Sequence, residues 1–560
     1  MALGLLSAVL WLTAAAALPV RVEPVFGARG MVVAGHPQAA QAGLETLQAG
    51  GNAIDAAVAV SLALGVAEPY GSGLGGKLML LHYEAATGKT YAVDAMDAAG
   101  SLDVAAYLKR PEEDRSYGYG SVCVPGLAAG LWAAHQKWGR LKWADAVAPA
   151  INLAREGFEI LPKTREFFAD QEKKLRRGDT EIARLYLPDG QLPAVGSHLA
   201  NADLAHTLGL IAQHGRDGFY RGPVAEAIVA AAQKGGGALT LADLASYEAR
   251  FVEPIGIDFR GYRLLAGPPP TNGAPLFLAI MKVLEDESFA GGPLRSAANL
   301  DQIGRAWREV QPLVQRSIGD APEAWFNFEK LVAPDSIQAI RAKIRAPAEP
   351  GLKVAGWDDS GFSASAMAAT THFVVADAAG NIVCATQSLS LHFGAGVVPP
   401  GTGVVLNDSM SNFAFSDPVS INYVASGKRS RSTIAPTLVF RGGKPVLAIG
   451  IPGASRIPTA LLQALLDRLA LGRPLAEAIG DTRVHFDRNW RKDNEETFEA
   501  ESSLPATDAE ALRQLGWKVE LVEAAGTGRN FGGINAIELV PGGGYTGYAD
   551  PRRTNAAVGY

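Results

Sequence analysis

Two adjacent threonines, Thr370 and Thr371, follow a segment without helical or strand periodicity and begin an apolar run typical of a β-strand. A threonine hydroxyl is a weak nucleophile until a base lies beside it, and the amine of an N-terminal threonine can be that base. Chain cleavage before Thr370 would therefore create an amide-attacking nucleophile together with its own base. Threonine pairs are common at strand starts, so this feature alone favours a purely structural role.

The elements around Thr370 are expected to form a β-hairpin at the end of a loop. The stretch 343–368 is rich in Ala, Pro, Gly, Ser and Asp, which predicts an exposed, mobile segment. Two apolar runs, 370–376 and 382–386, follow it and are separated by a turn at 377–381. This arrangement would hold Thr370 at the start of a strand and next to an accessible chain segment.

Apolar periodicity predicts further strands and helices that could support this hairpin. Strands are expected at 78–83, 90–93, 404–406, 437–440, 445–449 and 534–539. Helices are expected at 36–47, 56–67, 127–157, within 164–234, at 274–284 and at 459–471. Strands that pack together with helices on their outer faces predict an α/β fold, a four-layer αββα sandwich.

The composition indicates a globular protein and excludes several function classes. Of 560 residues, 48% are hydrophobic and 19% charged, and the net charge is −6 without an evident basic patch, so no nucleic-acid partner is expected. Cys123 and Cys384 lie in apolar runs and are expected to be buried. The nine histidines show no ligand spacing, so neither a metal nor another cofactor is predicted.

The N-terminal stretch carries a possible export signal. Residues 1–19 contain no charged side chain and end in small residues, which predicts a secretory signal with a cleavage site near Ala17. A periplasmic or secreted bacterial protein is therefore expected. The basic start of such signals is missing, and the run is nearly long enough to span a bilayer, so an uncleaved membrane anchor stays open.

A glycine-rich run, Gly71 to Lys77, matches the spacing of a phosphate-binding loop. Leu78 stands where that loop needs Ser or Thr for Mg²⁺, and the preceding segment is expected to be a helix instead of a strand. Nucleotide binding is therefore not expected.

The threonine pair belongs to a series of ordered motifs that resembles the γ-glutamyltransferase family over residues 27–560. In the C-terminal part, the motifs are Thr370–Phe373, Asp377, Gly380–Asn381, Thr386–Leu389, Phe393–Gly394, Pro400–Gly403, Leu406–Asn407, Gly427–Arg429, Ala435–Thr437, Pro452–Gly453, Ser455–Arg456, Ala549–Arg553 and Ala556–Tyr560. In the N-terminal part, they are Gly30–Val32, His36–Pro37, Gly50–Asn52, Asp55–Ala57, Ser72–Gly73, Ser121–Val122, Val124–Gly126, Leu153–Phe158, Leu239–Thr240, Asp243–Leu244 and Pro268–Pro270.

The resemblance implies an N-terminal-nucleophile hydrolase made as a proenzyme. Cleavage between Ala369 and Thr370 would give a heavy chain, 20–369, and a light chain, 370–560. Thr370 would attack the amide of a small-molecule or peptide donor and form an acyl-enzyme, which water or an acceptor amine resolves.

The resemblance also implies roles for the residues that accompany the nucleophile. Ser388 falls where the family has a threonine hydroxyl that hydrogen-bonds the nucleophile. Gly453 and Ala454 match the pair whose backbone N–H groups form the oxyanion hole, although alanine at 454 raises the question of whether the required φ is reachable. Ser432 and Thr433 match two hydroxyls that hold the donor's carboxylate.

The match fails at the residues that recognise the γ-glutamyl head group. Met96 stands where an arginine grips the carboxylate, Asn412 where an acidic residue pairs with the amine, Ser390 where an asparagine is expected, and Ser409 where Gln or Glu is expected. Each lost charge-assisted contact would cost roughly 1.5–3 kcal/mol. The sequence therefore predicts a donor without a free α-amine, such as the glutaryl-type amides that acylases of this family cleave.

Several alternatives stay open. Arg431 could supply a replacement cation or could face solvent. The stretch 416–426 is shorter than the lid loop of many relatives, which predicts a more open site. The protein could also be an ordinary glutathione hydrolase with a modified head-group site, or an inactive relative that acts as a binding protein.

Overall fold

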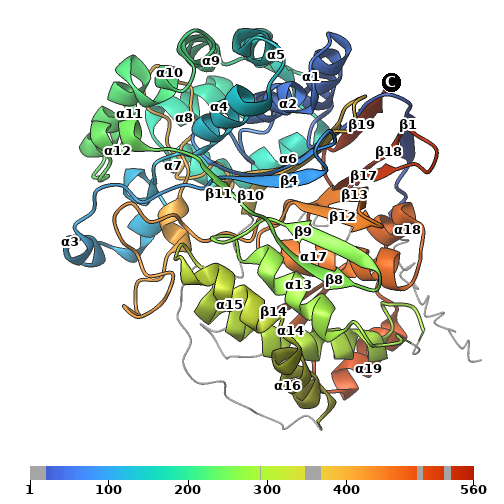
Figure 1. The fold of residues 1–560 in the computed structure, drawn as a ribbon. Helices are drawn as coiled ribbons and strands as arrows, with labels where there is room; N and C mark the ends of the chain where they lie inside the picture. The colour runs from blue at the N-terminus through green and yellow to red at the C-terminus, as the bar shows by residue number, and fades with distance from the viewer. Residues whose placement is uncertain (1–19, 290–291, 347–367, 489–495, 523–530) are drawn as a thin grey trace, which may run out of the picture.

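Two stacked antiparallel sheets form the centre of the molecule (Figure 1). The computed structural model describes residues 20–289, 292–346, 368–488, 496–522 and 531–560. Both sheets have seven strands, and every pairing within them is antiparallel. The residues predicted to form the secretory signal and most of the predicted mobile segment lie outside the described residues.

The first sheet, called the β10 sheet, contains the predicted hairpin. Its order is β19 (Ala556–Gly559), β2 (Met31–Ala34), β10 (Ala368–Ala376), β11 (Ile382–Leu391), β3 (Lys77–Glu84), β4 (Lys89–Ala95) and β7 (Arg250–Val252). The second, called the β12 sheet, has the order β1 (Pro24–Gly27), β18 (Tyr545–Ala549), β17 (Asn535–Leu539), β13 (Lys444–Gly450), β12 (Thr437–Arg441), β9 (Tyr262–Ala266) and β8 (Ile255–Phe259).

Side-chain alternation along β10 explains the layers. Phe373 and Val375 pack in the core beneath the helices, whereas Val374 and Ala376 pack in a separate cluster between the two sheets. Successive side chains of a strand point to opposite faces, so the continuous apolar run 373–376 of β10 must be covered on both sides.

Helices cover the outer face of each sheet, at the top and the bottom of Figure 1. The β10 sheet is covered by helices that include α1 (Pro37–Gln48), α2 (Ala53–Ala67), α4 (Leu127–Trp138), α5 (Trp143–Glu156), α9 (Ala202–His214) and α11 (Gly222–Lys234). The β12 sheet is covered by helices that include α13 (Gly273–Val283), α14 (Ala297–Ser317), α16 (Pro334–Arg345), α17 (Arg456–Leu465) and α19 (Ala506–Gln514). The predicted αββα sandwich is therefore confirmed.

Helix α2 precedes the glycine-rich run and is anchored at its N-terminus. Asn52 and Asp55 form a capping box at its N-terminus, and Asp55 also accepts hydrogen bonds from the N–H groups of Arg140 and Leu141. The helix is apolar all round and nearly all of it is buried, as expected for a helix enclosed by others.

Three sequence expectations need correction. Residues 404–406 form no strand, because only Leu406 pairs, in an isolated bridge with Gly75. The helical stretch 127–157 is divided into α4 and α5, since Gly139 ends α4 in an extended conformation. The predicted mobile segment begins inside α16, which runs to Arg345.

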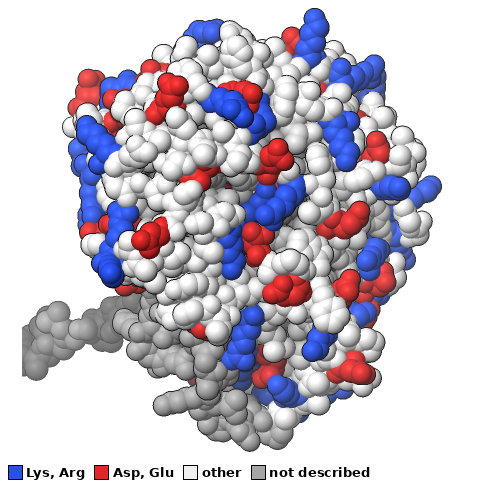
Figure 2. Space-filling view, turned by 60° about the vertical axis from the view of Figure 1, so that its left-hand side comes forward, with Lys and Arg blue, Asp and Glu red and all other residues white. Residues whose placement is uncertain are grey.

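The visible surface mixes both signs of charge: on the face in Figure 2, basic and acidic side chains alternate. No helix among the described residues is long and apolar enough to cross a membrane.

Candidate active site

Thr370 lies at an irregularity in the pairing of β10 with β11. Ala369 pairs with Ser390 and Thr371 with Gln387, so the register shifts across Thr370. The shift brings Thr370 next to Ser388. Bulges of this kind re-aim a side chain and often lie beside active sites. The Arg553 guanidinium donates a hydrogen bond of 3.1 Å to the Thr370 carbonyl and holds the strand there.

Two hydroxyls converge on the peptide bond that precedes Thr370. The Thr370 Oγ1 lies 2.5 Å from the Ala369 carbonyl oxygen and 3.1 Å from the Ser388 Oγ. Ser388 also donates to the same carbonyl oxygen, and its Oγ accepts from the Ser390 N–H at 3.0 Å. The two residues that flank this bond and Ser388 are almost fully buried. A nucleophile and a hydrogen-bond donor are thus placed on one carbonyl group.

The proposed oxyanion residues lie in a loop before helix α17. Gly453 has φ +148° and Ala454 has φ +52°, so alanine does reach the left-handed region, at a cost of about 1–2 kcal/mol. Among the described residues, neither N–H group donates a hydrogen bond. These donors therefore remain available, and the N-terminus of α17 adds a favourable dipole for negative charge.

Ser432 and Thr433 are half-buried and are joined to that loop. The Thr433 hydroxyl donates to the Ala454 carbonyl at 2.8 Å, and the Asn272 N–H donates to the Ser432 carbonyl at 2.8 Å. Gly273 permits this contact, because a Cβ there would lie 1.9 Å from the Thr433 oxygen.

Arg431 does not face solvent, so that alternative is wrong. Only 3% of the residue is exposed, and its guanidinium donates to the Gln315 carbonyl at the end of α14 at 2.9 Å.

Met96 is fully buried in the apolar cluster on the outer side of the β12 sheet. Its backbone N–H donates to Asp94 at 3.1 Å, and the Asp94 carboxylate forms an ion pair with Arg429 at 2.6 Å. Asp94 thus compensates the Arg429 charge.

A second polar cluster contains the three remaining altered positions and a lysine. The Lys77 Nζ donates to Ser390 Oγ at 2.6 Å and to Ser409 Oγ at 2.7 Å, and it lies 3.5 Å from Asp97. The Asn412 amide donates to Ser390 at 2.9 Å. Burial raises the pKa of Asp97 to about 6, although the ammonium of Lys77 and the Ser409 hydroxyl oppose the shift.

Lys77 is a site residue that the sequence alone does not predict, because there it stands only at the end of a phosphate-loop spacing. One signal could have indicated a role: Lys77 lies between a glycine run and an apolar strand that is expected to be buried. A lysine is almost never fully buried without a partner, so its position predicts a polar or charged partner nearby.

A buried carboxylate, also missed from the sequence, lies beneath β10. Glu68 accepts hydrogen bonds from Tyr70 at 2.9 Å and from Thr554 at 3.2 Å. Burial raises the pKa of Glu68, while Thr371 and Arg553 oppose this shift. Glu68 therefore connects the strand that holds Thr370 to the C-terminal segment of the chain.

His372 lies in strand β10, as expected from the apolar run 370–376. It is fully buried between the sheets, its Nδ1 lies 2.8 Å from Thr386 Oγ1, and burial lowers its pKa to about 3. Cys123 and Cys384 are buried, as predicted.

The glycine-rich run serves close backbone packing. It leads into strand β3 instead of a helix, so the geometry of a phosphate loop is absent. Added Cβ atoms would lie 2.1 Å from the Val405 oxygen at Gly75 and 2.3 Å from the Ser388 oxygen at Gly76. Glycine is therefore needed at both positions, where the backbone of strand β11 and of the loop at Val405 approach closely.

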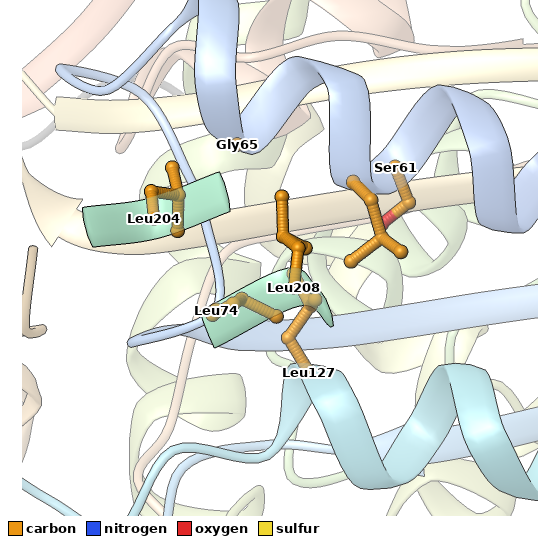
Figure 3. A pocket seen from close by; sticks show the side chains of 7 residues that line it. Ser61, Gly65, Leu74, Leu127, Leu204 and Leu208 are labelled. Atoms are coloured by element: carbon orange, nitrogen blue, oxygen red, sulfur yellow. The ribbon is translucent and has the colours of Figure 1, made fainter. Parts of the chain in front are cut away.

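A small cavity behind this run is lined mainly by leucines (Figure 3). Its lining residues are Ser61, Leu62, Gly65, Leu74, Leu127, Leu204 and Leu208, and none belongs to the site around Thr370.

Three comparisons relate this chain to known proteins. A family model described as gamma-glutamyltranspeptidase matches residues 39–560. The glutathione hydrolase proenzyme of Bacillus subtilis (strain 168) is 31% identical over 554 residues, covering 95% of this chain and 92% of the relative. The acylase ACY 1 proenzyme of Pseudomonas sp. (strain SE83) is 34% identical over 539 residues, covering 94% and 93%. The crystal structure of cephalosporin acylase from Bacillus halodurans is 28% identical, with a TM-score of 0.85 and 99% of each chain covered.

The fold and the site together define the class of N-terminal-nucleophile hydrolases: two stacked sheets between helical layers, with a threonine on a central strand. Within that class, the chain belongs to the gamma-glutamyltranspeptidase family. It is accordingly an enzyme of the γ-glutamyltransferase-like hydrolase and transferase type.

Proposed function

We propose that this protein is a self-processing amide hydrolase and acyltransferase whose nucleophile is Thr370, and whose acyl donor lacks a free α-amine. The observation that carries the proposal is the convergence of the Thr370 and Ser388 hydroxyls on the Ala369 carbonyl. Thr370 acts first on its own chain and then on a substrate.

In processing, the Thr370 Oγ attacks the Ala369 carbonyl carbon, and the Ser388 hydroxyl stabilises the negative oxygen that forms. The C–N bond then breaks, Ala369 remains on Thr370 as an ester, and the released amine takes up a proton. Water hydrolyses the ester. This leaves a heavy chain ending at Ala369 and a light chain beginning at Thr370, and the relatives named as proenzymes support such a step.

In turnover, the new amine accepts the Thr370 hydroxyl proton while the oxygen attacks the donor amide. The Gly453 and Ala454 N–H groups stabilise the oxyanion, because their donors are available in the described structure. The amine product leaves with a proton, and water or an acceptor amine resolves the acyl-enzyme.

The proposed donor is a glutaryl-type amide. The Ser432 hydroxyl can donate to a carboxylate, whereas the Thr433 hydroxyl donates to the Ala454 carbonyl and would have to reorient to do so. Met96 and Asn412 cannot provide the charges that a γ-glutamyl zwitterion requires. Relatives named acylases support this choice. Relatives named glutathione hydrolases favour the second candidate, an ordinary glutathione hydrolase with a modified head-group site.

Export belongs to the same proposal. We expect residues 1–19 to direct the chain to the periplasm or outside the cell, where they are either removed or kept as an anchor. N-terminal sequencing of the heavy chain after cell fractionation would distinguish removal from anchoring.

Denaturing gels and N-terminal sequencing test the processing step. Mature protein should give a heavy chain of about 37 kDa and a light chain of about 20 kDa, as scaled by residue number from 58.6 kDa for 560 residues. The light chain should begin with Thr-Thr-His-Phe. Thr370→Ala should give one band and no activity. A single wild-type band without activity would instead indicate an inactive binding protein.

Paired substrates test the donor. Glutaryl-p-nitroanilide and γ-glutamyl-p-nitroanilide differ only in the α-amine, so their kcat/KM values measure its effect directly. Efficient turnover of the γ-glutamyl compound would refute the proposed donor and favour the second candidate.

A further inference from the structure

Lys77 lies where the head-group contacts were expected. It begins strand β3, none of it is exposed, and its ammonium contacts both Ser390 and Ser409. Those two positions and Asn412 are the ones at which this chain departs from the residues that surround a γ-glutamyl amine. The cluster is close to the nucleophile, because the Ser390 N–H donates to Ser388.

The hydrogen bonds of this cluster leave its hydroxyls no spare capacity. A hydroxyl donates one hydrogen bond and accepts two. Ser390 accepts from Lys77 and from Asn412, so its own proton must point to Ser409 at 2.9 Å. Ser409 accepts from Lys77 and Ser390 and donates to Asp97. The chain of donors therefore runs from Lys77 and Asn412 through both serines to a carboxylate.

We infer that Lys77 is a specificity-determining residue: its ammonium occupies the position of a donor's α-ammonium and excludes donors that carry one. This inference rests on the proposed function and adds the physical cause of the donor preference. An incoming ammonium would meet two saturated hydroxyls and a like charge. An acyl group with CH₂ in that place needs no acceptor there and leaves the network intact.

Asp97 balances the resident charge and keeps the lysine in place. Its carboxylate is fully buried, contacts Ser409 and faces Lys77. The Lys77–Asp97 pair is therefore already formed in the absence of substrate. Lys77 would thus disfavour binding of any donor that carries an α-ammonium, without a prior conformational change.

The test compares Lys77→Ala with Lys89→Ala. Lys89 begins β4 in the same β-hairpin and its side chain is exposed, so it provides a matched loss of a lysine. The quantity measured is the ratio of kcat/KM for glutaryl-p-nitroanilide to that for γ-glutamyl-p-nitroanilide.

We expect Lys77→Ala to lower this ratio by about 10- to 100-fold, the range for one charge-assisted contact, and Lys89→Ala to leave it at the wild-type value. An unchanged ratio in Lys77→Ala overturns the inference, while a wild-type preference for the glutaryl donor would still support the proposed function. A wild-type preference for the γ-glutamyl donor overturns the proposed donor itself.

Lys77→Ala leaves Asp97 without its partner, so a second variant guards against misfolding. Lys77→Met with Asp97→Asn keeps unbranched and isosteric side chains of similar size, Met being one atom shorter than Lys, and removes both charges. It should lower the ratio at least about tenfold. Wild-type protein gives a third measurement: glutarate should inhibit about tenfold more strongly than L-glutamate, and equal inhibition would overturn the inference.

Discussion

Ser388→Ala provides the most direct test of the geometry at the cleavage bond. The substitution removes a buried hydroxyl that donates to the Ala369 carbonyl and lies 3.1 Å from the Thr370 Oγ. Loss of one oxyanion donor typically slows acyl transfer by about 100- to 1,000-fold, or roughly 2.7–4 kcal/mol of transition-state stabilisation. Self-cleavage of Ser388→Ala should therefore slow by about that factor.

The assay follows precursor conversion from the moment of synthesis. Cell-free translation with pulse labelling gives an unprocessed chain, and gel samples over time give a first-order rate. Ser388→Thr keeps the hydroxyl and serves as the matched control, and we expect it to process within about tenfold of wild type, the cost of a slight misplacement.

A wild-type rate in Ser388→Ala would refute the reasoning, because the hydroxyl would then contribute nothing to the transition state. A thermal melt of each precursor separates this result from a folding defect. If Ser388→Ala melts at the wild-type temperature and still cleaves slowly, the loss lies in the chemistry.

Three further predictions concern stability. Ala454→Gly should raise the free energy of unfolding by up to about 1 kcal/mol, because relief of left-handed strain outweighs the entropy of glycine; a lower melting temperature would contradict this. Arg553→Met should destabilise by about 3–5 kcal/mol, since buried Glu68 loses a compensating charge, and adding Glu68→Gln should recover part of the loss in the same chemical-denaturation assay. Burial lowers the pKa of His372 to about 3, so the unfolded chain binds a proton at this residue below pH 6.5 that the folded protein does not bind. The free energy of unfolding should therefore fall by about 1.4 kcal/mol for each pH unit below pH 6.5. His372→Gln should flatten the dependence of melting temperature on pH between pH 6.5 and 4, and an unchanged slope would show that His372 is not the responsible group.

Local patterns were sufficient to predict the hairpin that carries Thr370. Two short apolar runs on either side of a polar turn predict two antiparallel strands without reference to the rest of the chain. The prediction of a strand at 404–406 was wrong because strand pairing depends on the rest of the fold. A strand exists only where a partner edge is available, and Leu406 meets Gly75 alone.

The polar cluster around Lys77 could not be predicted from local patterns. Lys77 is separated by 313 residues from Ser390 and by 332 from Ser409, and no local period links such positions. Family motifs identified Ser390, Ser409 and Asn412 as altered, but they gave no partner for the alterations. Only the pairing of β3 with β11, which places Lys77 opposite Ser388, brings the lysine to them.

Strand β11 explains how donor choice could change while the chemistry stays. Ser388 and Ser390 are two residues apart and are directly linked, because the Ser390 N–H donates to the Ser388 Oγ at 3.0 Å. Ser388 contacts Thr370 and Ser390 contacts Lys77, and Ser390 has a positive φ of +82°. The proposed role of Lys77 therefore predicts that a change there alters the donor preference through Ser390, while the hydroxyls of Thr370 and Ser388 keep their geometry on the β10–β11 ladder. If Lys77→Ala slowed self-cleavage as strongly as Ser388→Ala does, this separation between selection and chemistry would not hold.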